Sequence, residues 1–330
     1  MPRRARQFAN RRTRPAFTLV ELLVVLAVLS MMASLVLVGL ASAAEQAKAA
    51  RTRSQIQRIH ELLMTRWDDY KYRRVEANKT GNIRTRQAAR LNKIRELMRI
   101  EMPDRKSDIS DAPVSLESVP GLQFRYQRSV VARTNSANYA AASVDTVWTP
   151  ANENAECLYL ILESIQDGDT NGLDFFKESE IGDTDGDGMF EILDGWGNPI
   201  IFLRWPFGYP IIEPTGVRRD ALSSLNDLSA PDPFDPLGVL GGKTTVSTTP
   251  LVYNHPIIFP LIFSAGPDGL YNIRTSPSAS YQASTTTPPN NPYFEDTSFS
   301  PATRTGMILD ASGDELDNIT NHQLVVGGNE

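Results

Sequence analysis

The chain has 330 residues, of which 41% are hydrophobic and 22% charged, a balance that excludes a wholly disordered or collagen-like protein. Its one cysteine, Cys157, excludes an intramolecular disulfide, and with only three histidines a zinc site of the Cys/His type is disfavoured. The net charge of −6 is a sum of opposed segments: residues 48–106 hold 17 basic and 7 acidic side chains, whereas residues 107–330 hold 10 and 30.

The first 41 residues have the pattern of a membrane anchor. Residues 1–16 contain six arginines and no acidic side chain, which predicts a basic leader peptide, and none of the 20 residues from Leu22 to Ala41 is charged. As a helix rising about 1.5 Å per residue, such a run covers the ~30 Å hydrocarbon core of a bilayer. We therefore expect residues 17–41 to cross the membrane once, with the basic flank in the cytoplasm and the rest of the chain outside.

Two export signals are alternatives to an anchor. A secretory signal peptide has an apolar core of about 7–15 residues, shorter than the run here, although Ala41-Ser42-Ala43 fits as its cleavage site. Arg11-Arg12 is the pair that a twin-arginine signal needs, but the neighbouring residues fit that motif poorly. The anchor is the preferred interpretation.

Glu21 is an acidic residue inside this otherwise apolar segment. An ionised group near the middle of a bilayer costs about 2.5–3.5 kcal/mol, and less near the interface, so such a carboxylate indicates a function and calls for a partner. If the chain is cut after Ala16, the new α-amine of Phe17 lies at the same depth. That amine is a cation, and it can pair with Glu21 of a neighbouring copy.

The segment from Pro15 to Leu29 resembles the prepilin cleavage and methylation signature of type IV pilins and type II secretion pseudopilins. The resemblance implies that a prepilin peptidase of the inner membrane cuts between Ala16 and Phe17 and methylates the Phe17 amine. It also implies that Glu21 guides assembly with other pilin-like subunits. Ala16 departs from the family pattern, which usually has Gly there.

A basic helical stalk is expected over residues 42–106, with a break near 78–82 where Asn, Gly and Thr cluster. The simplest interpretation of its charge is a solvated helix face. A second is electrostatic attraction between the basic stalk of one copy and the acidic head of the next. Nucleic-acid binding is disfavoured, because no aromatic stacking platform or known nucleic-acid motif accompanies the charge.

Residues 107–330 are expected to form an acidic globular head. Apolar spacing predicts a helix near 154–166, and β-rich runs bounded by Pro and Gly predict strands near 199–205 and 257–264. A loop-rich tail follows from 275 to 330, in which 307–309 and 323–326 are candidate further strands. The predicted fold class is α+β and pilin-like: a long amino-terminal transmembrane and stalk helix packed on a small antiparallel sheet with long loops.

Acidic loops over residues 167–194 contain the densest candidate chemistry. Two runs have alternating Asp or Asn side chains on a Gly-containing turn, a pattern that directs several oxygens at one centre and is typical of Ca²⁺ loops. The candidate ligands are Asp167, Asp169, Asn171 and Glu178 in the first run, and Asp183, Asp185, Asp187 and Asp194 in the second. The alternative for each is an acidic, solvated loop without metal.

Two further segments extend the resemblance. Residues 194–199 (Asp-Gly-Trp-Gly-Asn-Pro) resemble the segment that opens the antiparallel sheet of major pseudopilins, and residues 264–269 resemble a family turn whose loop holds calcium. By that resemblance, Ser264 and Asp268 are candidate ligands. The acidic end of that loop is not found in 271–280, which contains no Asp or Glu.

The hypothesis that explains most of these features is a non-enzymatic subunit of a pilus-like assembly, in particular a type II secretion pseudopilin. The alternative is a membrane-anchored extracytoplasmic calcium-binding protein or enzyme, with the acidic loops as its site. The alternative leaves Glu21 unexplained, and the sequence has no G-x-S-x-G, Walker or HExxH motif to support catalysis.

Overall fold

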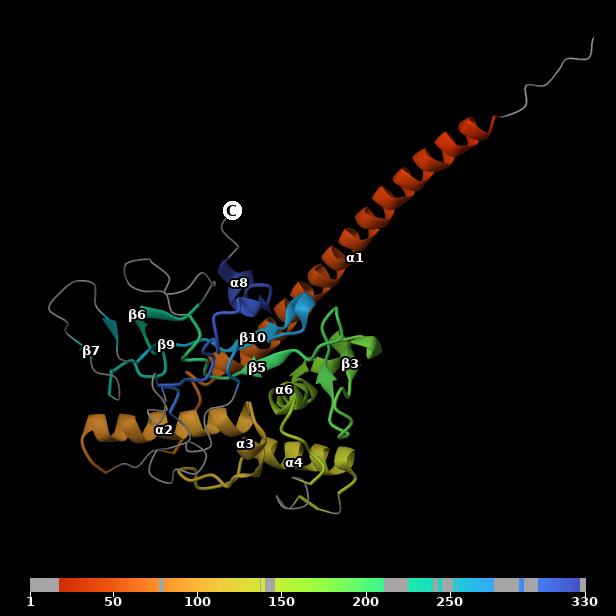
Figure 1. Cartoon of the computed structure of the whole chain (residues 1–330). Coiled ribbons are helices and arrows are strands. Elements are labelled where there is room, and N and C mark those ends of the chain that lie inside the picture. Colours follow the sequence, from red (N-terminus) through yellow and green to blue (C-terminus); the bar gives the residue numbers. More distant parts are fainter. Residues whose placement is uncertain are drawn as a thin grey trace, which may run out of the picture. The chain divides into compact units, whose positions relative to one another are not determined.

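The computed structural model describes residues 18–76, 80–136, 138–139, 146–210, 225–239, 243–244, 252–253, 255–275, 291–293 and 302–326. The contacts within the chain divide it into two compact units, Met1–Ala47 and Lys48–Glu330. Helix α1 (Leu19–Asp69) contributes residues to both units (Figure 1). The expected leader, residues 1–16, lies outside the described residues.

In the first unit, α1 is built almost entirely from Leu, Val, Ala, Met and Ser. Its one glycine there, Gly39, does not interrupt the helix. Among the described residues, α1 is the one helix that is long and apolar enough to cross a membrane. This agrees with the helix expected from the uncharged run.

In the second unit, α1 has a buried face. Ile56, Ile59, Leu63 and Trp67 recur at spacings of three and four and are at most 2% exposed. They share one hydrophobic core with side chains of the other helices and of the sheet. Residues 48–69, which the sequence places in a stalk, are therefore a core helix of the compact unit.

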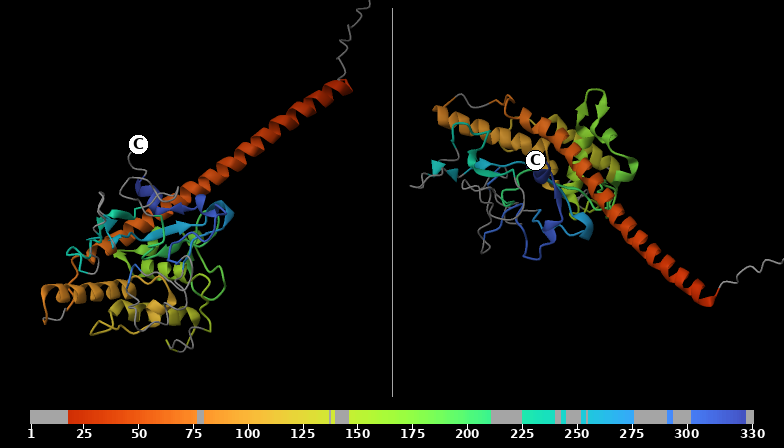
Figure 2. Two further views of the ribbon diagram at one scale, coloured as in Figure 1. Left: turned by 60° about the vertical axis from the view of Figure 1, so that its left-hand side comes forward. Right: turned by 90° about the horizontal axis from the view of Figure 1, so that it is seen from above.

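Helices α2 (Ile83–Glu101) and α6 (Glu153–Ser164) contribute to this core. Helices α3 (Lys106–Ser110) and α4 (Gly121–Thr134) form a second buried cluster with the other side of α6. Helix α2 begins where the Asn82 side chain accepts a hydrogen bond from the Thr85 amide (2.9 Å), an N-cap that follows the expected chain break. Helix α6 occupies the region in which the short amphipathic helix is expected. In Figure 2, α2 and α4 lie on one side of the strands and α8 (Asn321–Val326) lies on the other.

The main sheet is small and antiparallel, in the order β11 (Ile319–Thr320), β10 (Leu261–Ser264), β5 (Ile201–Leu203). Its register pairs Ile262 with Phe202 and Phe263 with Thr320. Strands β5 and β10 lie inside the two runs expected to be strands. The long helix and the antiparallel sheet confirm the α+β, pilin-like fold class.

Short elements fill the connections. The two-stranded pairs are β1 (Gln166–Asp167) with β2 (Thr170–Asn171), β3 (Ile181–Gly182) with β4 (Glu191–Ile192), β6 (Asp227–Pro231) with β9 (Pro256–Ile257), and β7 (Lys243–Thr244) with β8 (Val252–Tyr253). Single 3-10 turns are η1 (Gly172–Phe175), η2 (Glu178–Glu180), η3 (Gly266–Asp268) and η4 (Asp314–Leu316).

The candidate strand at 323–326 is wrong, because these residues lie in helix α8. The physical reason is a capping box: the Gln323 amide donates to Thr320 Oγ1 (3.3 Å) and the Thr320 amide donates to Gln323 Oε1 (3.4 Å). At 307–309 the structure has a single antiparallel bridge, between Ile308 and Ile273. The helix therefore starts directly after β11.

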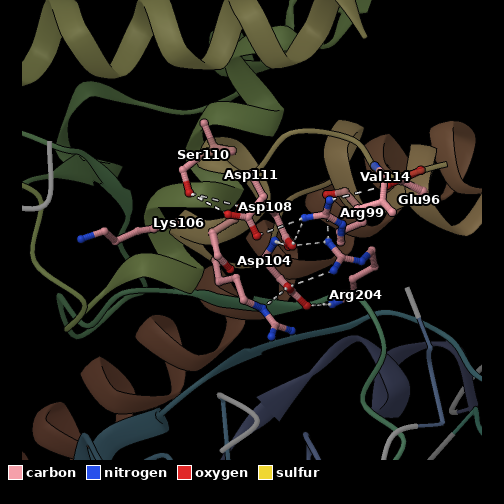
Figure 3. Close-up of polar contacts among 12 residues, drawn as sticks. Glu96, Arg99, Asp104, Lys106, Asp108, Ser110, Asp111, Val114 and Arg204 are labelled. Atoms are coloured by element: carbon pink, nitrogen blue, oxygen red, sulfur yellow. Dashed lines mark hydrogen bonds and ion pairs between the residues drawn. The ribbon is translucent and has the colours of Figure 1, made fainter. Parts of the chain in front are cut away.

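A network of buried charges joins α2, α3 and the end of β5 (Figure 3). Arg204 Nη1 donates to Asp108 Oδ2 (2.9 Å), Arg204 Nη2 lies 3.3 Å from Asp104 Oδ1, and Arg99 Nη1 donates to Asp108 Oδ1 (3.3 Å). Burial by itself raises the pKa of Asp108, but the guanidinium groups of Arg204, Arg105 and Arg99 outweigh it and hold that pKa well below its ordinary value. Asp108 is therefore ionised inside the protein.

Candidate functional site

At the amino terminus, α1 begins with a capping box formed by Thr18 and Glu21. The Thr18 amide and hydroxyl donate to Glu21 Oε2 (2.8 and 3.0 Å), and the Glu21 amide donates to Thr18 Oγ1 (3.2 Å). The Glu21 carboxylate thus lies in the first helical turn, where the helix dipole favours negative charge. The expected cleavage and methylation residues, Ala16 and Phe17, lie outside the described residues.

The second acidic run forms the loop between β3 and β4. Asp183 shapes it, because Asp183 Oδ1 accepts from the Gly186 amide (2.7 Å) and Asp183 Oδ2 from the Gly188 amide (3.0 Å). Gly186 and Gly188 have φ values of 79° and 91°, which a residue with a side chain rarely adopts. The turn brings one carboxylate oxygen each of Asp183, Asp185 and Asp187 within 4.8 Å of one another.

Residues just before α6 hold this loop in place. The Thr149 amide donates to Asp187 Oδ2 (2.6 Å), and the Thr149 hydroxyl donates to Asp185 Oδ2 (2.5 Å). Asn152 Nδ2 donates to Thr184 Oγ1 (2.8 Å). The acidic loop is therefore fixed against the start of the helix.

Two glutamates that were not predicted from the sequence lie beside Asp185 of this loop. Carboxylate oxygens of Glu156, in the first turn of α6, and Glu191, in β4, lie within 4.8 Å of each other and of an oxygen of Asp185. Both glutamates are fully buried. Glu191 stands eight residues after Asp183, where an EF-hand loop has its ninth position, so the spacing contained a signal for it. Glu156 is 27 residues upstream of Asp183, and no local spacing indicates it.

Burial and the neighbouring acids raise the pKa values of the two glutamates. Burial, and then the charges of Asp187, Asp185 and Glu191, raise the pKa of Glu156 to about 9 against a hydrogen bond from Trp148 that lowers it. Burial, and then Asp185 and Asp183, raise the pKa of Glu191 to about 7 against hydrogen bonds from Thr184 and Asn152. Hard carboxylate oxygens in this number suit a divalent cation such as Ca²⁺, so the cluster could bind a metal ion.

Asp194, expected as the last ligand of this loop, has another role. Asp194 Oδ1 accepts from the amides of Trp196 and Asn198 (2.8 and 2.9 Å), and Asp194 Oδ2 accepts from Ser264 Oγ (2.6 Å). The structure does not bring it into the described groups with Asp183, Asp185 and Asp187. Asp194 and Ser264 instead join the two segments that resemble pseudopilins.

The first acidic run is arranged differently. Asn171 Oδ1 accepts from the Leu173 amide (2.9 Å) and Asn171 Nδ2 donates to Glu163 O (3.0 Å), so its amide caps η1. Asp169 and Glu178 belong to no group of three acidic side chains among the described residues. The side chain of Asp167 lies outside what the structure describes.

At the turn over residues 264–269, Asp268 Oδ1 accepts from the Leu270 amide (2.8 Å). Gly266 has a φ of 71° and no room for a Cβ atom, because the carbonyl oxygen of Asp317 would lie 2.6 Å from it. The charge of Asp268, after burial, raises the pKa of Asp317. An acidic side chain thus meets this turn from 317, and not from 271–280, where the resemblance would place it.

The comparisons with known proteins concern the amino terminus. A family model described as the prokaryotic N-terminal methylation motif matches residues 11–42. The chain carries a prepilin-type signal. This methylation motif is the hallmark of type IV pilins and pseudopilins, and it confirms the resemblance of residues 15–29. The motif implies processing by a prepilin peptidase and pilin-like assembly, and with the apolar helix α1 it indicates a single-pass membrane anchor. No curated protein and no solved structure is significantly similar to the chain.

Proposed function

We propose that this chain is a structural subunit of a pilus-like assembly, cut between Ala16 and Phe17, methylated on Phe17 and polymerised through its amino-terminal helix. The observation that carries the proposal is the methylation motif over residues 11–42, which runs into an apolar helix with one acid, Glu21, in its first turn. Proteins with this motif are structural rather than catalytic, so the function requires no catalytic residue.

The proposed topology follows from the charge pattern. Residues 1–16 are the leader on the cytoplasmic side, residues 17–41 lie in the inner membrane, and the basic segment 42–106 and the acidic head 107–330 lie outside the cytoplasm. In the assembly, the charge of Glu21 is balanced by the α-amine of Phe17 from a neighbouring copy. Opposite charges on the two outer segments favour association between copies in the same way.

Within the pilin-like proteins, we assign the chain to type II secretion pseudopilins. Three features support this: Cys157 is a free, buried thiol, so no disulfide closes the head; residues 194–199 form the tight turn that Asp194 caps; and the acidic loops offer calcium sites. Bound calcium would hold loops that disulfides hold elsewhere. We place it at Asp183, Asp185 and Asp187, and a second ion at the turn with Ser264 and Asp268.

The test of processing is intact mass spectrometry of the protein purified from its native membrane, with sequencing of the amino-terminal peptide. The expected chain begins at Phe17 and has one added methyl group. Cells without prepilin peptidase are the control, in which the chain should begin at Met1. A wild-type chain that begins at Met1, or after Ala43, contradicts the proposal and leaves the apolar run as a plain anchor or signal peptide.

The test of the pseudopilin assignment is deletion of this gene in the native organism. Proteins normally secreted to the medium should accumulate inside the cell envelope, while surface pili remain. Loss of surface pili with normal secretion would instead assign the chain to a pilus. Complementation with the intact gene must restore secretion.

A further inference from the structure

Glu156 is the buried acid whose chemistry the proposed function leaves unexplained. Its side chain is 0% exposed, Oε2 accepts from Trp148 Nε1, and Oε1 has no hydrogen-bond partner among the described residues. A buried polar atom without a partner destabilises the fold, and more so when it is charged. A bound cation would supply the missing partner.

Within the part of the chain that the structure describes, no side-chain cation meets that need. Among the described residues, no lysine or arginine forms an ion pair with Glu156, Asp185 or Glu191. The charged groups that influence Glu156 are instead acids: Asp187, Asp185 and Glu191 all raise its pKa. The described residues thus gather carboxyl groups on both sides of Asp185 and place no side-chain cation among them.

Asp185 connects the two acidic groups. One of its oxygens lies within 4.8 Å of oxygens from Glu156 and Glu191, and it also lies in the group with Asp183 and Asp187. Five carboxylates from three elements, α6, the β3–β4 loop and β4, thus form two adjoining groups that share Asp185. Ca²⁺ accepts 6–8 oxygens in flexible geometry, whereas Mg²⁺ demands a near-ideal octahedron and keeps several waters, so this set favours Ca²⁺.

We propose that Glu156 and Glu191 complete one divalent-cation site with Asp183, Asp185 and Asp187, and that the bound cation ties helix α6 to the β3–β4 hairpin. This inference rests on the proposed calcium loop and extends it to a ligand from a separate helix. Helix α6 also packs on β5 of the main sheet through Leu158, Ile161 and Leu162. Cation binding therefore stabilises the head as a whole and not the loop alone.

The first experiment is calorimetric titration of Ca²⁺ into the metal-free full chain in detergent, for the wild type and three variants. Glu156→Gln keeps the size and the Trp148 contact but cannot ionise to bind a cation. Asp185→Asn removes the charge of the shared ligand, and Glu163→Gln changes a carboxylate on the same helix outside the site. We expect Glu156→Gln and Asp185→Asn to weaken Ca²⁺ binding at least about tenfold, and Glu163→Gln to leave it unchanged.

The outcomes separate the inference from the proposed calcium loop. If Glu156→Gln binds Ca²⁺ as tightly as the wild type while Asp185→Asn does not, the loop binds calcium and the role of Glu156 is refuted. If the wild type binds none, both are refuted, while the pilin-like function is judged separately from the amino-terminal mass. Thermal unfolding in EDTA gives a second readout: Glu156→Gln should melt no lower than the wild type and should lose the increase in Tm that Ca²⁺ gives.

A second measurement locates the ion. Trp148 lies next to the proposed site, and Trp196 lies at the turn that Asp194 joins to Ser264. Tb³⁺ used in place of Ca²⁺ should therefore emit when tryptophan is excited, and Trp148→Phe should remove most of that emission while Trp196→Phe retains it. The reverse result would place the tightest ion at the other turn and overturn the proposal.

Discussion

Arg204 Nη1 donates a hydrogen bond to Asp108 Oδ2 at 2.9 Å, and both side chains are buried. The same guanidinium donates to the carbonyl oxygens of Arg99 and Met102 (3.1 and 2.6 Å). Arg204 thus fixes the link between α2 and α3 against the end of β5. Breaking a buried ion pair on one side leaves an uncompensated charge, which is strongly destabilising.

We therefore expect Arg204→Met to lower the free energy of unfolding by about 3–5 kcal/mol. Urea unfolding of the detergent-solubilised chain measures this. The exposed pair Lys71–Asp68 is the control, and Lys71→Met should change stability by less than about 1 kcal/mol. A loss for Arg204→Met as small as the control would show that the network adds nothing to stability.

Glu21 has two roles that one pair of variants separates: it completes the capping box with Thr18, and it is the proposed partner of the Phe17 amine. Gln can complete a capping box but carries no charge, whereas Ala can do neither. If charge pairing governs assembly, Glu21→Gln and Glu21→Ala should both enter the membrane and both fail to join assemblies. Membrane fractionation and cross-linking between copies measure the two steps. Normal assembly of Glu21→Gln would reduce the role of Glu21 to helix capping.

We expect His322 to lower the stability of the head in mild acid. Its Nδ1 accepts from the Leu225 amide (3.1 Å), and burial, partly opposed by the Pro260 carbonyl, lowers its pKa from 6.5 to about 4. Between pH 6.5 and 4, His322 is protonated in the unfolded chain but stays neutral in the folded chain. The free energy of unfolding therefore falls as the pH goes from 6.5 to 4, and His322 does not change it above that window.

The full effect of His322 is about 3 kcal/mol. It is measured as the difference in pH dependence between the wild type and His322→Gln, whose side chain does not titrate. Other groups titrate in both proteins and cancel in the difference. Equal slopes between pH 6.5 and 4 would contradict the assignment.

Gly195, in the segment that resembles pseudopilins, packs too closely against α1 to accept a side chain. A Cβ atom at this position would lie 2.6 Å from Lys48 O and 2.9 Å from Lys48 Cα, and the Gly195 amide donates to Thr52 Oγ1 (2.9 Å). Gly195→Ala should therefore destabilise the head by about 1–3 kcal/mol. Gly121→Ala is the matched control, because Gly121 lies in α4 with open space around it, and should raise stability by about 0.5–1 kcal/mol. Thermal unfolding distinguishes the two, and equal effects would contradict this explanation.

Elements formed by residues that are close together in the chain could be predicted from the sequence. The apolar run predicts α1, the Gly and Asn near 78–82 precede α2, and the alternating acids indicate the turn that Asp183 closes. The capping box that starts α8 was also local, and the short apolar run that follows it obscured that signal.

The partners that the sequence could not indicate are distant in the chain. Glu156 reaches the acidic loop because α6 packs against β4, and Arg204 reaches Asp108 because β5 ends beside α3. Neither contact leaves a periodic or regularly spaced pattern in the sequence, because each depends on how separate elements pack. Asp194 shows the converse: its spacing fits a metal loop, but the tight turn after it and Ser264 occupy its carboxylate.

The separation between Arg204 and its acidic partners has a consequence for the order in which the head forms during synthesis. Asp104 and Asp108 leave the ribosome 100 and 96 residues before Arg204. At about 5–20 residues per second, Arg204 follows these carboxylates by roughly 5–20 s, and until then Arg99 and Arg105 are the cations of the network beside them. The network is incomplete without Arg204, so we expect the segment around α3 to join the core only after β5 has been translated.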